Sequence, residues 1–124
     1  MAEWDRSVLG VAAAIEAVTG LLLLIVPHLL VKLLLGVEVT GAAIVIGRVA
    51  GIALLSLGVG CWLGRQKAGG GWALVAMLLY NGLVTLYLAV VGLGTEFIGV
   101  LLWPAVVAHA VLTMLLGAAW LKTR

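Results

Sequence analysis

A long apolar run near the start of the chain, interrupted by one carboxylate, constrains the fold more than any other feature. The run extends from Ser7 to Pro27, and eight and ten apolar or small residues separate Glu16 from these two positions. About 20 helical residues, each rising about 1.5 Å, span the roughly 30 Å core of a bilayer. The run therefore predicts a transmembrane helix with an acid near its middle, where an unpaired charge costs several kcal/mol.

The whole chain has the composition of a protein that lipid surrounds. Of its 124 residues, 65% are hydrophobic and 10% are charged, whereas soluble domains carry about 25% charged residues. The net charge of +2 gives no reason to expect a nucleic-acid partner. A single cysteine, Cys61, excludes an internal disulfide. We expect no metal and no cofactor, because neither a His/Cys/Asp cluster with metal spacing nor a nucleotide-binding motif is present.

Four segments have the length and hydrophobicity of membrane spans. The predicted fold is therefore all-α: a polytopic membrane protein with one domain over residues 1–124, built as a four-transmembrane-helix bundle. Pro27 lacks a backbone donor, so the first helix should end there. His28 and Lys32 then give the next segment one polar face, as in a short helix that lies in the membrane interface and ends at Gly36. The predicted spans are 8–26, 42–63, 72–91 and 103–121, and the predicted interfacial helix is 27–35.

Two further boundaries follow from glycine and proline. A basic, glycine-rich stretch over 64–71 predicts the clearest loop. The fourth helix begins either near Phe97, with a kink at Pro104, or at Trp103, with Pro104 in its first turn. We favour the second start, because it places Trp103 and Trp120 about 26 Å apart, at the two aromatic belts of a bilayer.

Lysine and arginine are distributed unequally between the two ends of the predicted bundle. Only Lys32 lies at one end, and the positive-inside rule assigns the opposite end to the cytoplasm. We therefore expect both termini to be cytoplasmic. The basic residues at the cytoplasmic end are Arg6, Arg65, Lys67, Lys122 and Arg124.

Glycines four residues apart in the second span predict close helix packing. Such pairs let two helix backbones approach, which drives association in lipid. The pairs are Gly47 with Gly51 and Gly60 with Gly64. A small, glycine-rich bundle is also expected to form a homo-oligomer or to join a partner membrane subunit.

One polar or charged side chain interrupts each predicted span: Glu16, Arg48, Asn81 and His109. In a membrane such groups are satisfied when they point into the bundle and meet one another, so we expect the four to converge. Glu16 and Arg48 form the expected charge pair, and Tyr80 is a further candidate for lining a pocket. Three interpretations stay open. The cluster fixes which helices pack together, it binds a ligand or moves a proton, or Glu16 is protonated, next to lipid or at a subunit contact.

A pattern of glycines, a proline and an arginine extends over about residues 11–117. Its members are Gly20, Pro27, Leu29, Leu30, Gly36, the segment Gly47-Arg48-Val49-Ala50-Gly51, Gly58, Asn81 and His109. This pattern resembles the DoxX-like superfamily of small four-helix bacterial membrane proteins. The resemblance implies the bacterial cytoplasmic (inner) membrane, and the name-giving protein is a membrane subunit that partners a quinone oxidoreductase. No cofactor motif in this chain carries that activity over.

These features favour a small integral membrane protein that binds a lipophilic ligand, such as a quinone or a lipid, or serves as an accessory membrane subunit. An alternative is a membrane-embedded enzyme with Glu16 or His109 as acid or base on a lipophilic substrate. A second alternative is a proton-coupled exporter similar to the small multidrug transporters, which also carry a carboxylate in the first of four helices. The small residues around Glu16 and the unequal charge distribution argue against that exporter.

Overall fold

The computed structural model describes residues 1–67 and 70–124, and five helices make up the described part. Four of them are long and apolar enough to cross a membrane, and the second is short. The expectation of an all-α protein with four long apolar helices is confirmed for the described residues. The helices are α1 (Glu3–Ile25), α2 (Pro27–Leu35), α3 (Ala42–Gly64), α4 (Gly70–Leu93) and α5 (Leu102–Lys122).

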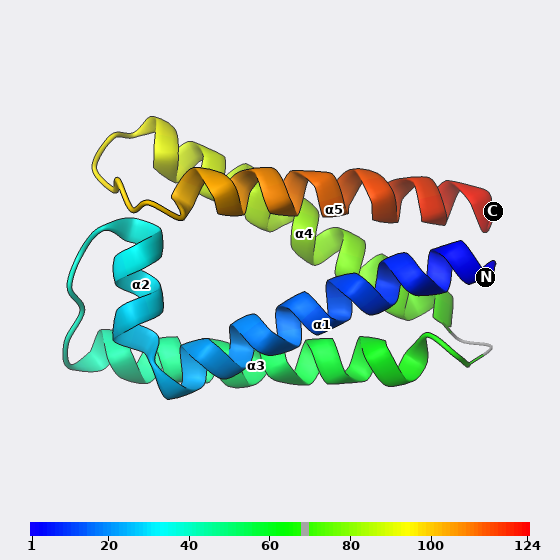
Figure 1. The fold of residues 1–124 in the computed structure, drawn as a ribbon, viewed down its shortest axis with the longest axis horizontal. Coiled ribbons are helices and arrows are strands. Elements are labelled where there is room, and N and C mark those ends of the chain that lie inside the picture. The colour runs from blue at the N-terminus through cyan, green and yellow to red at the C-terminus, as the bar shows by residue number, and fades with distance from the viewer. Residues whose placement is uncertain (68–69) are drawn as a thin grey trace.

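Pro27 separates the first two helices, as the sequence predicts. α1 ends at Ile25, and the proline lies in the first turn of α2, where its missing N–H leaves no helical hydrogen bond unmade. α2 ends at Gly36, whose φ of 73° is the left-handed conformation that glycine adopts without a steric penalty. Figure 1 shows α2 lying crosswise to the long helices, at one end of the bundle.

The first and last helices begin at positions that local hydrogen bonding and proline explain. α1 starts at Glu3, before the predicted residue 8, and the Asp5 carboxylate accepts a hydrogen bond of 3.1 Å from the Ala2 backbone N–H at its first turn. α5 starts at Leu102, with Pro104 in its first turn. This start agrees to within one residue with the favoured alternative.

The loop predicted over 64–71 is shorter than expected at both ends. Gly64 is the last residue of α3, and Gly70 and Gly71 already belong to α4. The rest of the predicted loop includes residues 68–69, which lie outside the described residues.

The long helices associate as two pairs, α1 with α3 and α4 with α5 (Figure 1). Glycines let α1 and α3 touch through their backbones. A Cβ at Gly51 would lie 2.7 Å from the Gly20 carbonyl oxygen, and one at Gly58 would lie 2.7 Å from the Ala13 carbonyl oxygen. Gly47 lies at the same contact, where a Cβ would be 3.4 Å from Pro27. Glycine is thus required where the two helices cross.

The second predicted glycine pair does not pack as expected. A Cβ at Gly60 would meet no atom within 4 Å, whereas one at Gly64 would lie 3.5 Å from Ala73 of α4. Two residues turn a helix by about 200°, so Gly60 faces away from the helix that Gly58 contacts. The prediction was wrong for Gly60 because the contact with α1 follows the face of Gly51 and Gly58.

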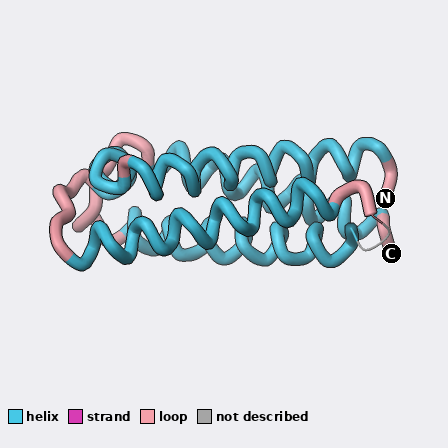
Figure 2. The backbone as a smooth tube through the Cα atoms, turned by 90° about the horizontal axis from the view of Figure 1, so that it is seen from below, coloured by secondary structure: helices cyan, strands magenta, loops and turns pink. Residues whose placement is uncertain are grey.

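The apolar core lies between α1, α4 and α5, toward the end of the bundle that carries both termini. Its fully buried members include Leu9, Leu74, Met77 and Leu116. Figure 2 shows the long helices running side by side, with loops at the two ends and both termini at the same end. An even number of long antiparallel helices produces this arrangement.

The opposite end of the bundle is covered by α2 and the connection between α4 and α5. The Leu101 N–H donates a hydrogen bond of 2.8 Å to the Leu33 carbonyl. Gly99 packs directly on the backbone of Leu34, where any side chain would overlap that backbone. These contacts hold the connection against α2.

Candidate functional site

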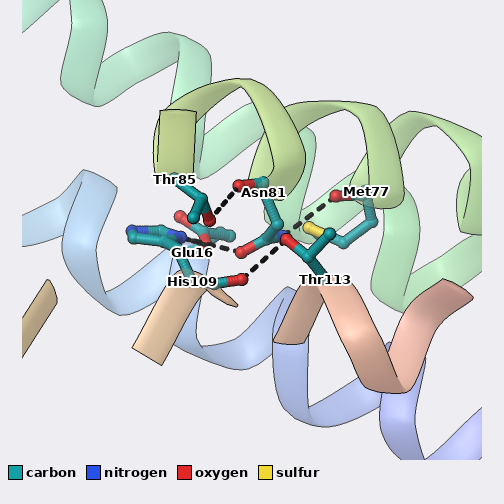
Figure 3. Close-up of polar contacts among 6 residues, drawn as sticks. All are labelled: Glu16, Met77, Asn81, Thr85, His109 and Thr113. Carbon is teal, nitrogen blue, oxygen red and sulfur yellow. Dashed lines mark hydrogen bonds and ion pairs between the residues drawn. The ribbon is translucent and has the colours of Figure 1, made fainter. Parts of the chain in front are cut away.

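A direct hydrogen bond between Asn81 of α4 and His109 of α5 lies at the centre of the bundle (Figure 3). Asn81 is fully buried, and its Nδ2 donates to the Met77 carbonyl at 2.9 Å. The amide oxygen of Asn81 therefore faces His109 Nδ1, at 2.8 Å. Since an amide oxygen only accepts, Nδ1 of His109 carries the proton in this contact.

Glu16 of α1 lies beside this pair and has no exposed surface. Its Oε1 is 3.7 Å from His109 Nδ1, within the range of an ion pair but beyond that of a hydrogen bond. Among the residues that the structure describes, neither carboxyl oxygen of Glu16 has a partner in hydrogen-bond geometry, although the Tyr80 hydroxyl lies close enough to interact with it. Buried polar groups are nearly always hydrogen-bonded, so this carboxyl group is the feature that most needs an explanation.

An aromatic side chain and two threonines border the three central residues. The ring of Tyr80 meets the imidazole of His109 edge-on, with 6.0 Å between centroids, and its phenol lies next to the Glu16 carboxyl group. Thr85 donates to the Asn81 carbonyl and Thr113 to the His109 carbonyl, each at 2.7 Å (Figure 3). Both threonine hydroxyl groups therefore donate within their own helices, so neither donates a hydrogen bond to the Glu16 carboxyl.

The expected ion pair between Glu16 and Arg48 does not form. Arg48 is exposed on α3, and within the described residues it takes part in no ion pair. The antiparallel packing of α1 against α3 explains why Arg48 and Glu16 do not meet. Gly47, the residue before Arg48, lies beside Leu23 and Pro27. Arg48 is therefore level with the end of α1, about 10 Å along the helix from Glu16. Of the four residues expected to converge, the structure brings together Glu16, Asn81 and His109, and α3 contributes none.

An apolar groove of about 530 Å³ opens between α4 and α5 next to this cluster. Thr85 and Thr113, which hydrogen-bond to the backbone of Asn81 and His109, both line it. Its other lining residues are Leu78, Leu79, Gly82, Leu83, Leu86 and Ala110. The groove has the apolar character that a lipid-soluble molecule requires, and the two threonines connect it to the helical turns that carry Asn81 and His109.

The arrangement offers acid–base and hydrogen-bonding chemistry. Glu16 can accept or donate a hydrogen bond according to its protonation, and His109 can exchange a proton through its ring nitrogens. The described residues bring together no group of three or more His, Cys, Asp and Glu side chains that could hold a metal ion.

Thr85 and Thr113 were not singled out from the sequence, although a signal for them exists. Each follows a polar residue by four positions, Asn81 and His109 respectively, and thus lies one helical turn farther along the same face. A threonine at that spacing donates to the carbonyl one turn earlier, which is what both residues do.

Comparison with known proteins adds no family to this description. The chain matches no protein-family model, no curated protein and no solved structure. The function is therefore argued from the cluster of Glu16, Asn81 and His109 and from the surrounding helices.

Proposed function

We propose that this chain is a small integral membrane protein that binds a lipophilic ligand at Glu16, Asn81 and His109. The ligand is quinone-like or lipid-like and carries a carbonyl or hydroxyl group at its polar end. The observation that carries this proposal is the fully buried Glu16 carboxyl, which within the described residues has the Tyr80 phenol beside it but no partner in hydrogen-bond geometry. A ligand hydroxyl would donate to the carboxylate, and a ligand carbonyl would accept from the protonated carboxyl.

The α4–α5 groove supports a path for such a ligand. Its walls are apolar, and its two threonines belong to the turns that follow Asn81 and His109. The apolar part of the ligand would occupy this groove while its polar end displaces the contact between His109 and Asn81 or joins it. Small residues one turn before Glu16 on its own helix, the fully buried Ala12 and Ala13, add no polar group that could pair with the carboxyl.

Membrane insertion belongs to the same proposal, with both termini in the cytoplasm of a bacterium and α2 in the opposite interface. Three basic side chains stack on tryptophans at the end that carries the termini: Arg65 on Trp62, Lys122 on Trp4 and Arg124 on Trp120. Tryptophan is enriched at both membrane interfaces, whereas lysine and arginine are enriched on the cytoplasmic side, so the basic side chains at this end support the orientation. The resemblance to the DoxX-like superfamily supports an accessory subunit, as a homo-oligomer or beside a partner membrane protein.

Ligand extraction tests the proposal. The protein is purified in mild detergent, extracted with organic solvent, and the extract is analysed by mass spectrometry for quinones and other lipophilic compounds. We expect a compound in stoichiometric amount with the natural chain, and less than about a tenth of it with Glu16→Leu or Asn81→Leu. Leucine can neither donate nor accept a hydrogen bond, and one hydrogen bond lost from a buried site corresponds to roughly tenfold in affinity. Arg48→Leu is the matched control, because Arg48 is exposed and away from the cluster.

Unchanged extraction from Glu16→Leu and Asn81→Leu would reject the proposed site. Equal loss in Arg48→Leu would also contradict it, because the compound would then depend on the membrane surface of α3 rather than on the buried cluster.

The distance of 3.7 Å between Glu16 and His109 favours a second candidate, a membrane-embedded enzyme. In it Glu16 and His109 act as acid and base on a lipophilic substrate. This candidate differs from simple binding in one measurement. The extracted compound would be chemically altered on incubation with the natural protein and would remain unaltered with both Glu16→Gln and His109→Gln.

A further inference from the structure

A second cavity lies toward the end of the bundle that carries the termini, and its lining includes none of Glu16, Asn81 and His109. α1 and α3 cross at their glycines and then diverge toward this end (Figure 1). A pocket of about 700 Å³ opens between them, which we call the terminal pocket. Its lining residues are Glu3, Arg6, Ser7, Gly10, Val11, Ala14, Trp62, Arg65 and Gln66. Two guanidinium groups and one carboxylate thus share one cavity.

Arg65 is held in place within the terminal pocket. Its guanidinium stacks on the Trp62 ring at 3.5 Å, and its Nη1 donates to the Trp62 carbonyl at 2.6 Å. Gly10 of α1 leaves room for this arrangement, because a Cβ there would lie 3.4 Å from Arg65 Cδ and Nε. An arginine has five N–H donors, so the remaining ones are available to an oxygen anion in the pocket.

An apolar groove continues from the terminal pocket toward the middle of the bundle. This α1–α3 groove has a volume of about 330 Å³ and shares Ala14 and Trp62 with the pocket. Its other lining residues are Ala13, Ala17, Val18, Gly58, Val59 and Leu63. From Gly10 to Val18 the helix rises about 12 Å. A charged cavity at the proposed interface therefore adjoins an apolar groove that leads toward the middle of the bundle.

We propose that the terminal pocket and the α1–α3 groove together bind one phospholipid whose headgroup carries an ammonium, as in phosphatidylethanolamine. Its phosphate lies between Arg6 and Arg65, and an acyl chain follows Ala14 and Val59 along the groove. Glu3 decides the headgroup: its carboxylate pairs with an ammonium, whereas it repels a headgroup that carries only negative charge. Arginine suits phosphate because its planar fork of donors matches two phosphate oxygens.

The test measures phospholipid retention with matched variants. The full chain is incorporated into nanodiscs of equal phosphatidylethanolamine and phosphatidylglycerol, released into detergent, and its bound lipids are counted by native mass spectrometry. We expect one retained phosphatidylethanolamine, and at least about tenfold less with Arg65→Gln, since a hydrogen bond to a charged group is worth about 1.5–3 kcal/mol. Arg124→Gln is the control, because Arg124 also stacks on a tryptophan, Trp120, at 4.3 Å, outside the residues that line the pocket.

A second variant tests the groove without changing any charge. Ala14 is exposed and lines both cavities, so Ala14→Phe should fill their junction and abolish retention while the helix content by circular dichroism stays unchanged. Val107→Phe is its control for size, since Val107 is exposed on α5. Glu16→Gln should retain the phospholipid, which separates this proposal from that of the central site.

Three results would overturn the inference. Equal retention by Arg65→Gln and Arg124→Gln would show that the arginine pocket plays no part. Equal or stronger retention of phosphatidylglycerol would exclude the ammonium-bearing headgroup. Displacement of the bound lipid by inorganic phosphate alone would identify the pocket as a site for a soluble anion.

Discussion

The side-chain amide of Asn81 fixes how α4 and α5 are aligned, because its nitrogen and its oxygen each make a hydrogen bond. Its Nδ2 donates to its own helix at Met77, and its Oδ1 accepts from His109 of α5. An amide at this position specifies how α4 and α5 are aligned, because a shift by one residue would break the interhelical bond. Asn81 thus acts as a structural residue as well as a member of the proposed ligand site.

Replacing Asn81 by leucine should destabilise the bundle by about 1 kcal/mol. The His109 N–H loses its partner, although Glu16 at 3.7 Å can take over part of that role. The free energy of unfolding is measured by titration with sodium dodecyl sulfate, followed by circular dichroism. Arg48→Leu should change it by less than about 0.5 kcal/mol. A larger effect of Arg48→Leu than of Asn81→Leu would contradict the description of both residues.

Lys32 of α2 and Glu38, which follows α2, form an exposed ion pair outside the four long helices. The Lys32 ammonium, by hydrogen bond and charge, holds the pKa of Glu38 below its ordinary value of 4.5, and Glu38 raises the pKa of Lys32 above 10.5. The contribution of Glu38 to stability is present above its unfolded pKa and is lost as the pH falls through the folded one. The contribution of Lys32 is present below its unfolded pKa and is lost as the pH rises through the folded one.

The pair therefore contributes in the window between these two ordinary values, and salt should weaken it because both groups are exposed. In an NMR titration of the Glu38 carboxyl group, we expect Lys32→Gln to return the pKa of Glu38 toward 4.5. Lys67→Gln, at the other end of the bundle, is the control. An unshifted titration in Lys32→Gln would disprove the ion pair.

At the scale of the helix, the contact between α1 and α3 depends on Gly20, Gly51 and Gly58. A Cβ added at any of these three glycines would meet backbone atoms of the other helix. For Gly51 the nearest atoms are the Gly20 carbonyl oxygen and the Leu24 nitrogen, each at 2.7 Å. Backbone cannot give way as a flexible side chain does. Gly51→Ala should therefore force the helices apart and destabilise the bundle by about 1–3 kcal/mol.

Gly60→Ala provides the matched substitution on the same helix. A Cβ there meets nothing within 4 Å, and alanine favours a helix over glycine by up to about 1 kcal/mol. We expect this variant to be as stable as the natural chain or more stable in the same unfolding titration. If Gly51→Ala were equally harmless, the close crossing of α1 and α3 would be incorrect.

The helices could be predicted from sequence more completely than the site. The lengths of the apolar segments and the position of Pro27 indicate where helices begin and end, because each helix boundary depends on the sequence of a single segment. Which neighbour a side chain meets depends on where two helices cross. Because α3 contacts α1 through Gly51 and Gly58, Arg48 lies on an exposed face of α3. Neither the position of Arg48 within the predicted span nor its charge indicates that exposure. A contact between Asn81 and His109 could be predicted, since each polar side chain needs a hydrogen-bond partner inside the bundle. The lack of a partner in hydrogen-bond geometry for Glu16 could not be predicted.

At the scale of the whole molecule, four long helices place both termini at one end (Figure 2). If the proposed orientation is right, the loop with Glu96 lies outside the cell and that with Lys67 lies inside. In a Cys61→Ala background, Glu96→Cys should react with a membrane-impermeant maleimide on intact cells. Lys67→Cys should react only after permeabilisation. The reverse pattern would require the opposite topology.

The crosswise placement of α2 has a consequence for how solutes arrive. Toward the termini the Glu16 carboxyl is followed along the bundle axis by the fully buried Leu9, Leu74 and Leu116, and at the far end α2 and the 94–101 connection cover the helices. Entry from water along the axis is thereby obstructed, which leaves the sides of the bundle. For the proposed membrane protein and its proposed ligand, the occupancy of the centre should then follow the concentration of the compound dissolved in the lipid. Two compounds with equal hydrogen-bonding groups should differ in apparent affinity by the ratio of their membrane partition coefficients.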